Sequence, residues 1–220
     1  MPLSKEEINR KLLHILSGTL IPAGILYIPL IDGCSPLTPA ILLGICAFGS
    51  VLLEYLRFHN ARVQALFIRL GASMLRQAES HSFTGSTYIF LSAFICSLLF
   101  FEHPHVAAIA LSLFILGDAA AALIGISFGR IKIGKKSLEG SAACFLLGML
   151  LFLVVYPHVP LLLDQWQGKV SLSLMVVIAL ANTLFELFPL RLGARLTIND
   201  NLSVPLITGT LLLLLQPVLG

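Results

Sequence analysis

The chain has 220 residues, of which 57% are hydrophobic and only 11% are charged, and its mean hydropathy is +0.95. About a quarter of the residues of a soluble domain are charged, so this composition excludes an ordinary soluble protein. It predicts instead an all-α polytopic membrane protein.

Seven apolar stretches approach or exceed the length of about 20 residues that a helix needs to cross a hydrocarbon core of roughly 30 Å. They cover residues 12–31, 38–56, 84–101, 105–128, 141–163, 171–190 and 202–219. The first stretch contains Pro22 and Pro29 and lacks a small-residue cleavage site, so we expect a retained helix rather than a signal peptide. The longest polar interval, 57–83, includes an amphipathic piece and leaves no room for a soluble domain. We therefore expect one integral membrane domain, 1–220.

The cations predict the orientation of these stretches. Thirteen of the fourteen Lys and Arg residues lie in the N-terminal segment or in the second, fourth and sixth intervals, and only Lys169 lies on the other side. By the positive-inside rule, the cation-rich side is cytoplasmic. The chain is thus predicted to have a cytoplasmic N-terminus and an active site that faces the cytoplasm, where most polar motifs lie.

Asp118 lies in the middle of the fourth apolar stretch. A carboxylate at membrane depth costs about 2.5 to 3.5 kcal/mol, so it marks an ion, proton or substrate site. Helical spacing places Ala122, Gly125 and Gly129 on the same stripe, where small side chains let a helix or a ligand approach closely. The stripe fits internal packing and also a homodimer. Asp118 lies about 15 Å from the cytoplasmic end, which predicts either a water-filled notch or a helix that breaks at Gly125 or Gly129.

The segment 135–141, KKSLEGS, precedes the fifth stretch. Ser137 or Ser141 can cap the following helix, and its first backbone amides together with the two lysines form an anion site. The acid Glu139 beside these cations suits a metal-bound phosphate better than a lipid headgroup. The predicted phosphate-binding residues are Lys135, Lys136, Ser137, Gly140 and Ser141.

Two further acids lie near the cytoplasmic ends of the last two stretches. Asn182 and Glu186 are four residues apart and share a helix face, which fits either a bridge between helices or a site. Asp200 and Asn201 open the seventh stretch, and capping explains only one of them.

The N-terminal segment contributes a cationic helix face made of Arg10, Lys11 and His14. It fits either membrane anchoring or a polar pocket. Glu54 and Arg57 are three residues apart and are predicted to form an ion pair.

Several acids and several cations thus converge on one face of the membrane. Phosphoryl transfer needs this mixture, because carboxylates hold a divalent ion and cations neutralise phosphate charge. The chain has neither a GxxxxGK[ST] loop nor a kinase-like GxGxxG motif, so a nucleotide would be bound by a membrane fold of its own.

Four motifs resemble the polyprenol and dolichol kinase family, which includes phytol kinases and CTP-dependent diacylglycerol kinases. They are RKLLH at 10–14, TGSTYIFL at 84–91, the GD to KSLEG block within 117–143, and NDNLSVPL at 199–206. The block is also more distantly similar to that of CDP-diacylglycerol synthases. The resemblance implies transfer of the terminal phosphate of a nucleoside triphosphate, typically CTP, to a long-chain isoprenoid alcohol or to diacylglycerol, with Mg²⁺ or another divalent cation.

By motif match, the resemblance implies a nucleotide and metal site. Its residues are Asp118, Lys136, Ser137, Glu139 and Gly140, with Asp200 and Asn201 nearby. We expect Asp118, Glu139 and Asp200 to hold the metal and Lys135 and Lys136 to neutralise the phosphates. Asp118, Glu139 and Lys136 are the predicted catalytic residues, and Arg10, Lys11 and His14 complete the pocket. The proton acceptor stays open among Asp118, Glu186 and Asp200.

Two other functions compete with the kinase. A CDP-diacylglycerol synthase-like cytidylyltransferase would carry a long charged C-terminal signature, and the chain has only NDNLSVPL there. An ion-coupled transporter would have polar residues on both sides of the membrane and paired repeats, and the sequence shows neither. We therefore expect a nucleoside triphosphate, a lipid alcohol and membrane lipids as partners, and no nucleic acid. The choice among CTP, ATP and UTP stays open.

Overall fold

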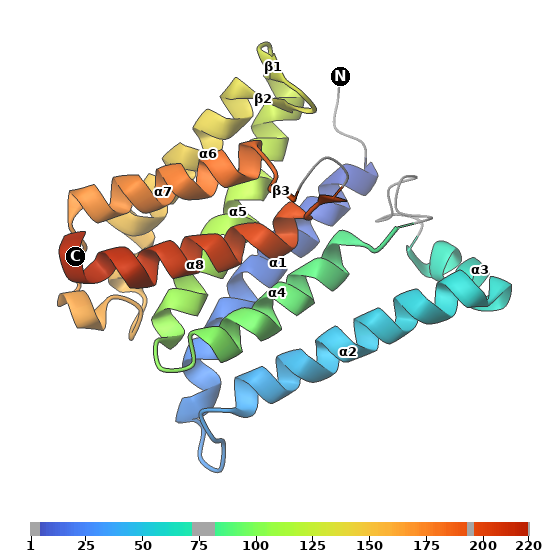
Figure 1. Ribbon diagram of the computed structural model, residues 1–220, viewed down its shortest axis with the longest axis horizontal. Helices are drawn as coiled ribbons and strands as arrows, with labels where there is room; N and C mark the ends of the chain where they lie inside the picture. Colours follow the sequence, from blue (N-terminus) through green and yellow to red (C-terminus); the bar gives the residue numbers. More distant parts are fainter. Residues whose placement is uncertain (1–4, 72–81, 193–195, 220) are drawn as a thin grey trace.

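The computed structural model describes residues 5–71, 82–192 and 196–219, and these form a helical bundle (Figure 1). The helices are α1 (Lys5–Tyr27), α2 (Thr38–His59), α3 (Ala61–Gly71), α4 (Gly85–Leu99), α5 (Pro104–Ser127), α6 (Leu138–Leu150), α7 (Leu172–Leu187) and α8 (Asp200–Leu219). The short helical turns are η1 (Ile28–Leu30), the π-helical η3 (Leu151–Val155), η4 (Tyr156–His158) and η5 (Asp164–Trp166). The predicted all-α polytopic fold is thus confirmed.

Each of the seven predicted stretches coincides with a helix. Five helical segments of the described chain are long and apolar enough to cross a membrane, namely Leu12–Leu30, Thr38–His59, Pro104–Ser127, Leu138–His158 and Asp200–Leu219. The other two, α4 and α7, have 15 and 16 residues. The number of seven spans and the cytoplasmic N-terminus stay predictions. Large apolar side chains such as Phe48, Leu146 and Leu172 are exposed on the outside, as a bilayer requires.

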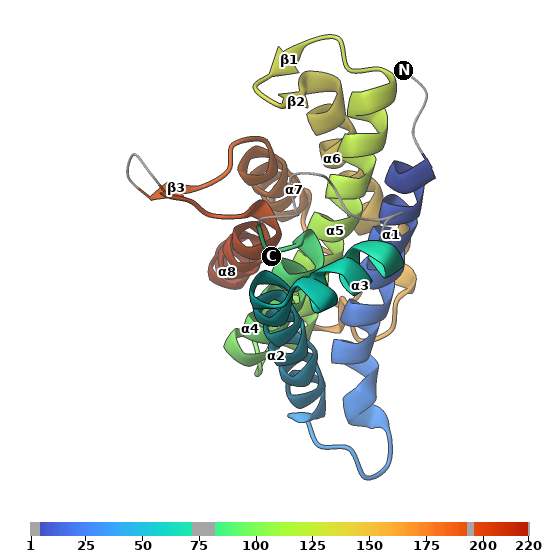
Figure 2. The same cartoon turned by 90° about the vertical axis from the view of Figure 1, so that its right-hand side faces the viewer.

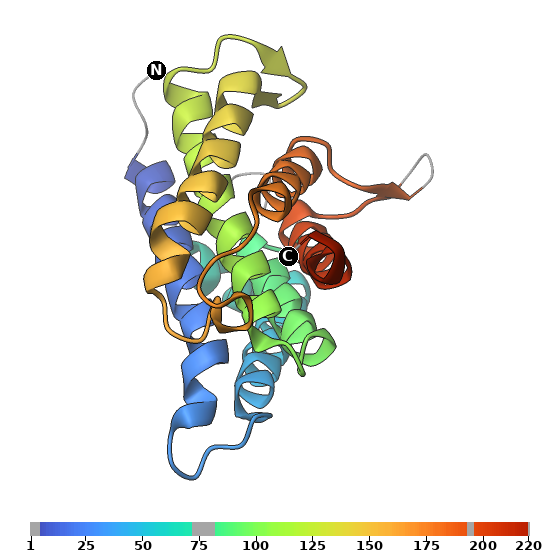
Figure 3. The ribbon, with the colours of Figure 1, turned by 90° about the vertical axis from the view of Figure 1, so that its left-hand side faces the viewer.

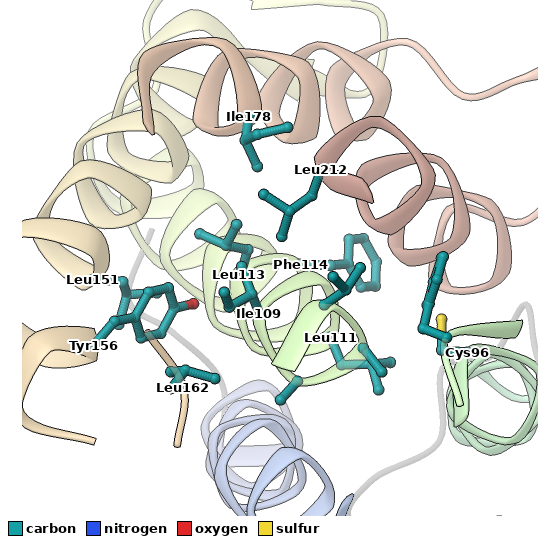
Figure 4. Packing of buried hydrophobic residues seen from close by; sticks show 14 of the residues in the cluster. Cys96, Ile109, Leu111, Leu113, Phe114, Leu151, Tyr156, Leu162, Ile178 and Leu212 are labelled. Atoms are coloured by element: carbon teal, nitrogen blue, oxygen red, sulfur yellow. The ribbon is translucent and has the colours of Figure 1, made fainter. Parts of the chain in front are cut away.

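Helix α5 is the centre of the bundle. Half of its span is buried, compared with 22% to 33% for the other four long segments. Its first half is apolar on every side, and a helix of that kind is stable only when neighbours surround it. Figure 4 shows Leu113 and Phe114 of α5 among side chains of other helices, including Ile178 and Leu212. Asp118 therefore belongs to the most enclosed of these five segments.

The predicted small-residue stripe is an internal seam between α5 and the chain that follows it. A Cβ atom on Gly125 would lie 2.8 Å from Oγ of Ser137, and one on Gly140 would lie 2.5 Å from the carbonyl oxygen of Ala121. On the same helix, a Cβ on Gly117 would lie 2.8 Å from Sγ of Cys144. Of the two alternatives, internal packing therefore accounts for the stripe without a second copy of the chain.

Two short antiparallel hairpins project from the same side of the bundle (Figures 2 and 3). The first, β1 (Lys132–Ile133) with β2 (Lys136–Ser137), connects α5 to α6. The second, β3 (Arg191–Leu192) with β4 (Leu196–Thr197), connects α7 to α8. The chain thus twice builds a helix, a hairpin and a helix. Both hairpins face the same way, unlike the inverted repeats of many transporters.

Candidate functional site

A cavity of about 1540 Å³ opens beside the two hairpins. Its wall includes residues of α1, α3, α4 and α5, both hairpins, the end of α7 and the first turns of α6 and α8. Nine residues predicted for the site line it: His14, Asp118, Lys135, Lys136, Ser137, Gly140, Ser141, Asp200 and Asn201. The side chains of Arg10 and Lys11 lie outside the described part of the chain. One cavity thus brings together motifs that are almost 190 residues apart in the sequence.

Asp118 lies well inside α5, about 13 Å from its end at Ser127 at 1.5 Å per residue. The helix continues through Gly125 and ends at Ser127, so the predicted break at Gly125 is wrong and the helix stops two residues before Gly129. The cavity instead extends down to Asp118, as the notch alternative requires. There Oδ2 of Asp118 lies 3.4 Å from Nε2 of His14 on α1. This pair joins α1 to α5 at the bottom of the polar part of the cavity.

Lys136 is held by two acids from other helices. Its Nζ donates hydrogen bonds to Oε1 of Glu186 at 2.6 Å, to the backbone carbonyl of Glu186, and to Oδ2 of Asp200 at 3.0 Å. Burial alone would lower the pKa of Lys136, but the two carboxylates outweigh it and raise the pKa above its ordinary value of 10.5. Lys136 is therefore a permanent cation that joins β2 to α7 and α8.

The second carboxylate oxygen of Glu186 has no hydrogen-bond partner among the described residues, although the side chain is only 3% exposed. The carboxylates of Asp118 and Asp200 interact electrostatically with it. Lys136 pairs with both Glu186 and Asp200, so one lysine faces two carboxylates, and a divalent cation would balance the remaining negative charge. A buried anionic oxygen without a donor is costly, so the site favours a ligand that supplies positive charge.

The described residues contain no group of three His, Cys, Asp or Glu side chains spaced as a complete metal cage. Mg²⁺ does not need one, because it is usually held by one or two carboxylates and by the oxygens of substrate phosphates. One or two of the carboxylates of Asp118, Glu186 and Asp200 would therefore suffice for Mg²⁺ when a phosphorylated substrate completes its shell, and the metal stays a prediction.

Glu139, predicted as a metal ligand, has a different position. Its Oε1 accepts hydrogen bonds from the backbone N–H groups of Arg130 at 3.0 Å and Ile131 at 3.1 Å, and it does not line the cavity. The structure does not bring it together with Asp118 and Asp200. Its carboxylate instead fixes the turn before β1 and thereby the position of the first hairpin.

Three helices begin at the cavity. Ser137 caps α6, as predicted, because its Oγ accepts a hydrogen bond from the N–H of Gly140 at 3.2 Å. The first residues of α4 and α8 also line the cavity, and Nδ2 of Asn201 donates to the carbonyl of Gly85 at 3.1 Å. Helix N-termini carry partial positive charge, so three of them around one cavity favour a polyanion.

A buried polar cluster fixes the start of α4. Oε1 of Glu54 accepts hydrogen bonds from the N–H and Oγ1 of Thr84, each at 2.8 Å, and from Oγ1 of Thr87 at 3.1 Å. Arg57 donates to Oε2 of Glu54, so the predicted ion pair is confirmed, and also to the carbonyl of Ser82. The motif TGST at 84–87 thus positions one wall of the cavity.

The cavity also has an apolar lining. Leu13, Ser17 and Ile21 are spaced by four residues, so they share one face of α1, and all three line the cavity. Phe67 of α3 and Phe90 of α4 line it as well.

Four further polar residues line the cavity but were not predicted for the site, namely Lys132, Arg191, Thr197 and Asn199. Glu186 was predicted only as a candidate proton acceptor. A local signal existed for the hairpins: IKIGKKS at 131–137 resembles LRLGARLT at 190–197. The apolar wall of α3 had no signal beyond its amphipathic pattern.

Comparisons with known proteins give relatives over nearly the whole chain. An uncharacterized protein of Rickettsia prowazekii is 27% identical over 203 residues, which are 91% of this chain and 90% of that protein. A probable chloroplastic phytol kinase of Triticum aestivum is 28% identical over 94% of this chain and 66% of its own length. Phytol kinase 1 of Arabidopsis thaliana is 26% identical over 93% and 65%.

The chain spans about two thirds of the length of these plant kinases. No protein-family profile matches the chain. No solved structure matches it with significance. The more distant similarity to CDP-diacylglycerol synthases stays a prediction. The relatives do confirm, from most of the sequence, that the chain is similar to the phytol kinases of the polyprenol kinase group.

Proposed function

We propose that the chain is a lipid-alcohol kinase that transfers the terminal phosphate of a nucleoside triphosphate, with CTP as the donor, to a long-chain isoprenoid alcohol. One observation carries this proposal: a single cavity is lined both by carboxylates, cations and three helix starts and by apolar side chains of α1, α3 and α4. The similarity to proteins named phytol kinases supports the same reaction class.

The polar lining has the parts that a triphosphate needs. Lys135, beside the start of α6, would bind phosphate oxygens, while Lys136 holds Glu186 and Asp200 in place. Asp118, Glu186 and Asp200 would hold Mg²⁺, which neutralises charge on the transferred phosphoryl group when it is bound. By the distribution of cations in the sequence, this polar lining faces the cytoplasm.

The apolar lining has the parts that a lipid needs. The alcohol would enter laterally beside α1, with its tail along Leu13, Ser17 and Ile21 and its hydroxyl near the Asp118 and His14 pair. The hydroxyl oxygen attacks the γ-phosphorus, the bond from this phosphorus to the bridging oxygen breaks, and the nucleoside diphosphate leaves. His14, oriented by Asp118, accepts the hydroxyl proton.

A labelling assay tests the reaction. Purified protein is incubated with Mg²⁺, with CTP labelled at the γ or the α phosphate, and with phytol, a polyprenol, diacylglycerol or phosphatidate. We expect γ label in phytol or the polyprenol. Label from the α phosphate in phosphatidate would establish the cytidylyltransferase instead, and no label in any lipid would leave a transporter as the explanation.

A variant tests the site. Asp118→Asn keeps the size of the side chain but removes its charge, so we expect transfer to fall at least about a hundredfold. Asp164→Asn is the matched control, because Asp164 is exposed in η5 and does not line the cavity. Full activity of Asp118→Asn would contradict the assignment of this carboxylate to the site.

A further inference from the structure

The two hairpins resemble each other in sequence. In IKIG at 131–134 and LRLG at 190–193, a basic residue lies between two branched aliphatic residues and is followed by glycine. In the first hairpin Gly134 has φ of +61°, the left-handed conformation that glycine adopts without strain. Each pattern connects two helices, so the resemblance extends to the architecture around it.

The strand pairing places equivalent chemistry at equivalent positions. Lys132 is the cross-strand partner of Ser137 in the first hairpin, and Arg191 is the partner of Thr197 in the second. In both, a cation is opposite a hydroxyl. Directly opposed residues of an antiparallel pair have their side chains on the same face. Lys132 is exposed and its Nζ donates to the carbonyl of Gly125 at 3.4 Å, whereas Ser137 is buried and its Oγ accepts from Gly140.

All four of these side chains line the cavity, and Figures 2 and 3 show both hairpins on one side of the bundle. Among the described residues, ion pairs with carboxylates involve His14, Arg57 and Lys136. Neither Lys135 nor Arg191 takes part in these pairs. Arg191 thus brings to the cavity a charge that no described carboxylate within ion-pair distance neutralises. Its guanidinium also has the planar geometry that binds phosphate with two parallel hydrogen bonds.

We infer that β3–β4 is the second half of a phosphate clamp, in which Arg191 and Thr197 bind the polyphosphate of the nucleotide from the side opposite Lys132 and Ser137. The inference rests on the proposed function only in taking a nucleoside triphosphate as the donor. Two cation and hydroxyl pairs suit a chain of phosphates better than a single phosphate, because each pair binds a different group of the same chain. The clamp therefore recognises the length of the polyphosphate.

A binding measurement tests the clamp without any catalytic turnover. The full chain in nanodiscs of phosphatidylcholine is titrated with CTP, CDP and CMP in the presence of Mg²⁺, and heat or the fluorescence of a labelled CTP analogue is recorded. For Arg191→Met we expect the Kd for CTP to rise at least about tenfold, as loss of one charge-assisted phosphate contact predicts, and the Kd for CMP to change much less. Arg191→Lys keeps the positive charge, so it should raise the Kd for CTP less than Arg191→Met does.

The control is Arg130→Met, because Arg130 is exposed beside the first hairpin but does not line the cavity. Its Kd for CTP should stay within about twofold of the wild type, since exposed charges outside a site contribute little. Thr197→Val provides a second variant that keeps the charge and should also weaken CTP binding. An unchanged Kd for CTP in both Arg191→Met and Thr197→Val would overturn the clamp, as would a wild-type protein that binds no nucleotide.

Basic hairpins at a membrane surface also attract lipid headgroups, which share the chemistry of phosphate. Nanodiscs with phosphatidylglycerol distinguish the two sources. If Arg191→Met weakens only the binding of anionic lipid and leaves CTP binding unchanged, the clamp is overturned. If it weakens CTP binding but the wild type phosphorylates no alcohol, the clamp is supported and the proposed function fails.

Discussion

Nζ of Lys136 lies 2.6 Å from Oε1 of Glu186, and this contact joins the first hairpin to the end of α7. The same ammonium reaches Oδ2 of Asp200 at 3.0 Å, so three segments that meet at the cavity depend on one cation. Glu186 is buried and Lys136 is about three-quarters buried, at 26% exposure. The ion pair between them therefore determines how the polar part of the cavity is assembled.

Replacing Lys136 by methionine should destabilise the protein by about 3 kcal/mol, because removing one partner of a buried ion pair leaves the other charge uncompensated. The free energy of unfolding, measured by denaturant titration in detergent, checks this value. Lys135→Met is the matched control, since Lys135 is exposed and its loss should stay within about 0.5 kcal/mol. A double variant with Glu186→Gln should lose less than the sum of both single variants.

The raised pKa of Lys136 also predicts a pH dependence. A group with a raised pKa in the folded state stabilises the protein fully below its unfolded pKa, and this stabilisation is lost as the pH rises through the folded pKa. The ordinary pKa of lysine is 10.5, so the contribution of Lys136 to the free energy of unfolding should stay constant through neutral pH. It should be lost only when the pH rises above 10.5. Unfolding free energies of wild type and Lys136→Met should therefore differ equally at pH 6 and pH 9 and converge in strong alkali.

Gly140→Ala should separate the start of α6 from α5. The new Cβ would lie 2.5 Å from the carbonyl oxygen of Ala121, and a backbone atom cannot move aside cheaply. A displacement of 1 Å in a site can cost about a hundredfold in rate, so we expect at least a tenfold loss of kcat. Gly49→Ala is the control, because a Cβ there meets nothing within 4 Å and the protein should keep its activity and gain slightly in Tm.

Ile21→Trp tests the apolar part of the cavity. The larger ring would occupy the place proposed for the lipid tail, so the KM for phytol should rise about tenfold while the KM for the nucleotide stays unchanged. Leu20→Trp on the same helix is the control, since Leu20 is exposed on the outer surface and does not line the cavity. Equal effects of both variants on phytol would argue against this route.

Glu54→Gln should weaken the start of α4. The variant leaves Arg57 buried without its carboxylate partner, which costs about 3 kcal/mol. Thermal unfolding in detergent would reveal the loss as a lower Tm. Glu102→Gln, at an exposed position, should leave the Tm unchanged.

Much of the bundle could be predicted from the sequence, because apolar length alone identifies every helix of the described chain except α3. Helix α5 shows why: its apolar run from Val106 to Leu116 has no polar face, and such a run must be enclosed or lie in lipid. The capping role of Ser137 and the pairing of Glu54 with Arg57 were equally predictable, because both depend on residues three apart on one helix turn.

The site was less predictable because its contacts are not local. Glu139 has the spacing of a metal ligand, yet backbone N–H groups of Arg130 and Ile131 are within its reach and occupy its carboxylate. Lys136 meets Glu186 across 50 residues, and no periodicity in the sequence measures that distance. Arg191 was overlooked because a single cation after an apolar stretch also fits ordinary positive-inside anchoring.

The depth of Asp118 gives the proposed reaction a direction. The alcohol reaches this level as a neutral molecule, so its hydroxyl stays there at little cost. Its phosphorylated product carries about two negative charges, which are strongly disfavoured some 13 Å below the end of α5 unless cations or water surround them. The product is therefore driven outward to the membrane surface as soon as it forms, and back-reaction is limited by the same solvation energy that makes a buried aspartate expensive.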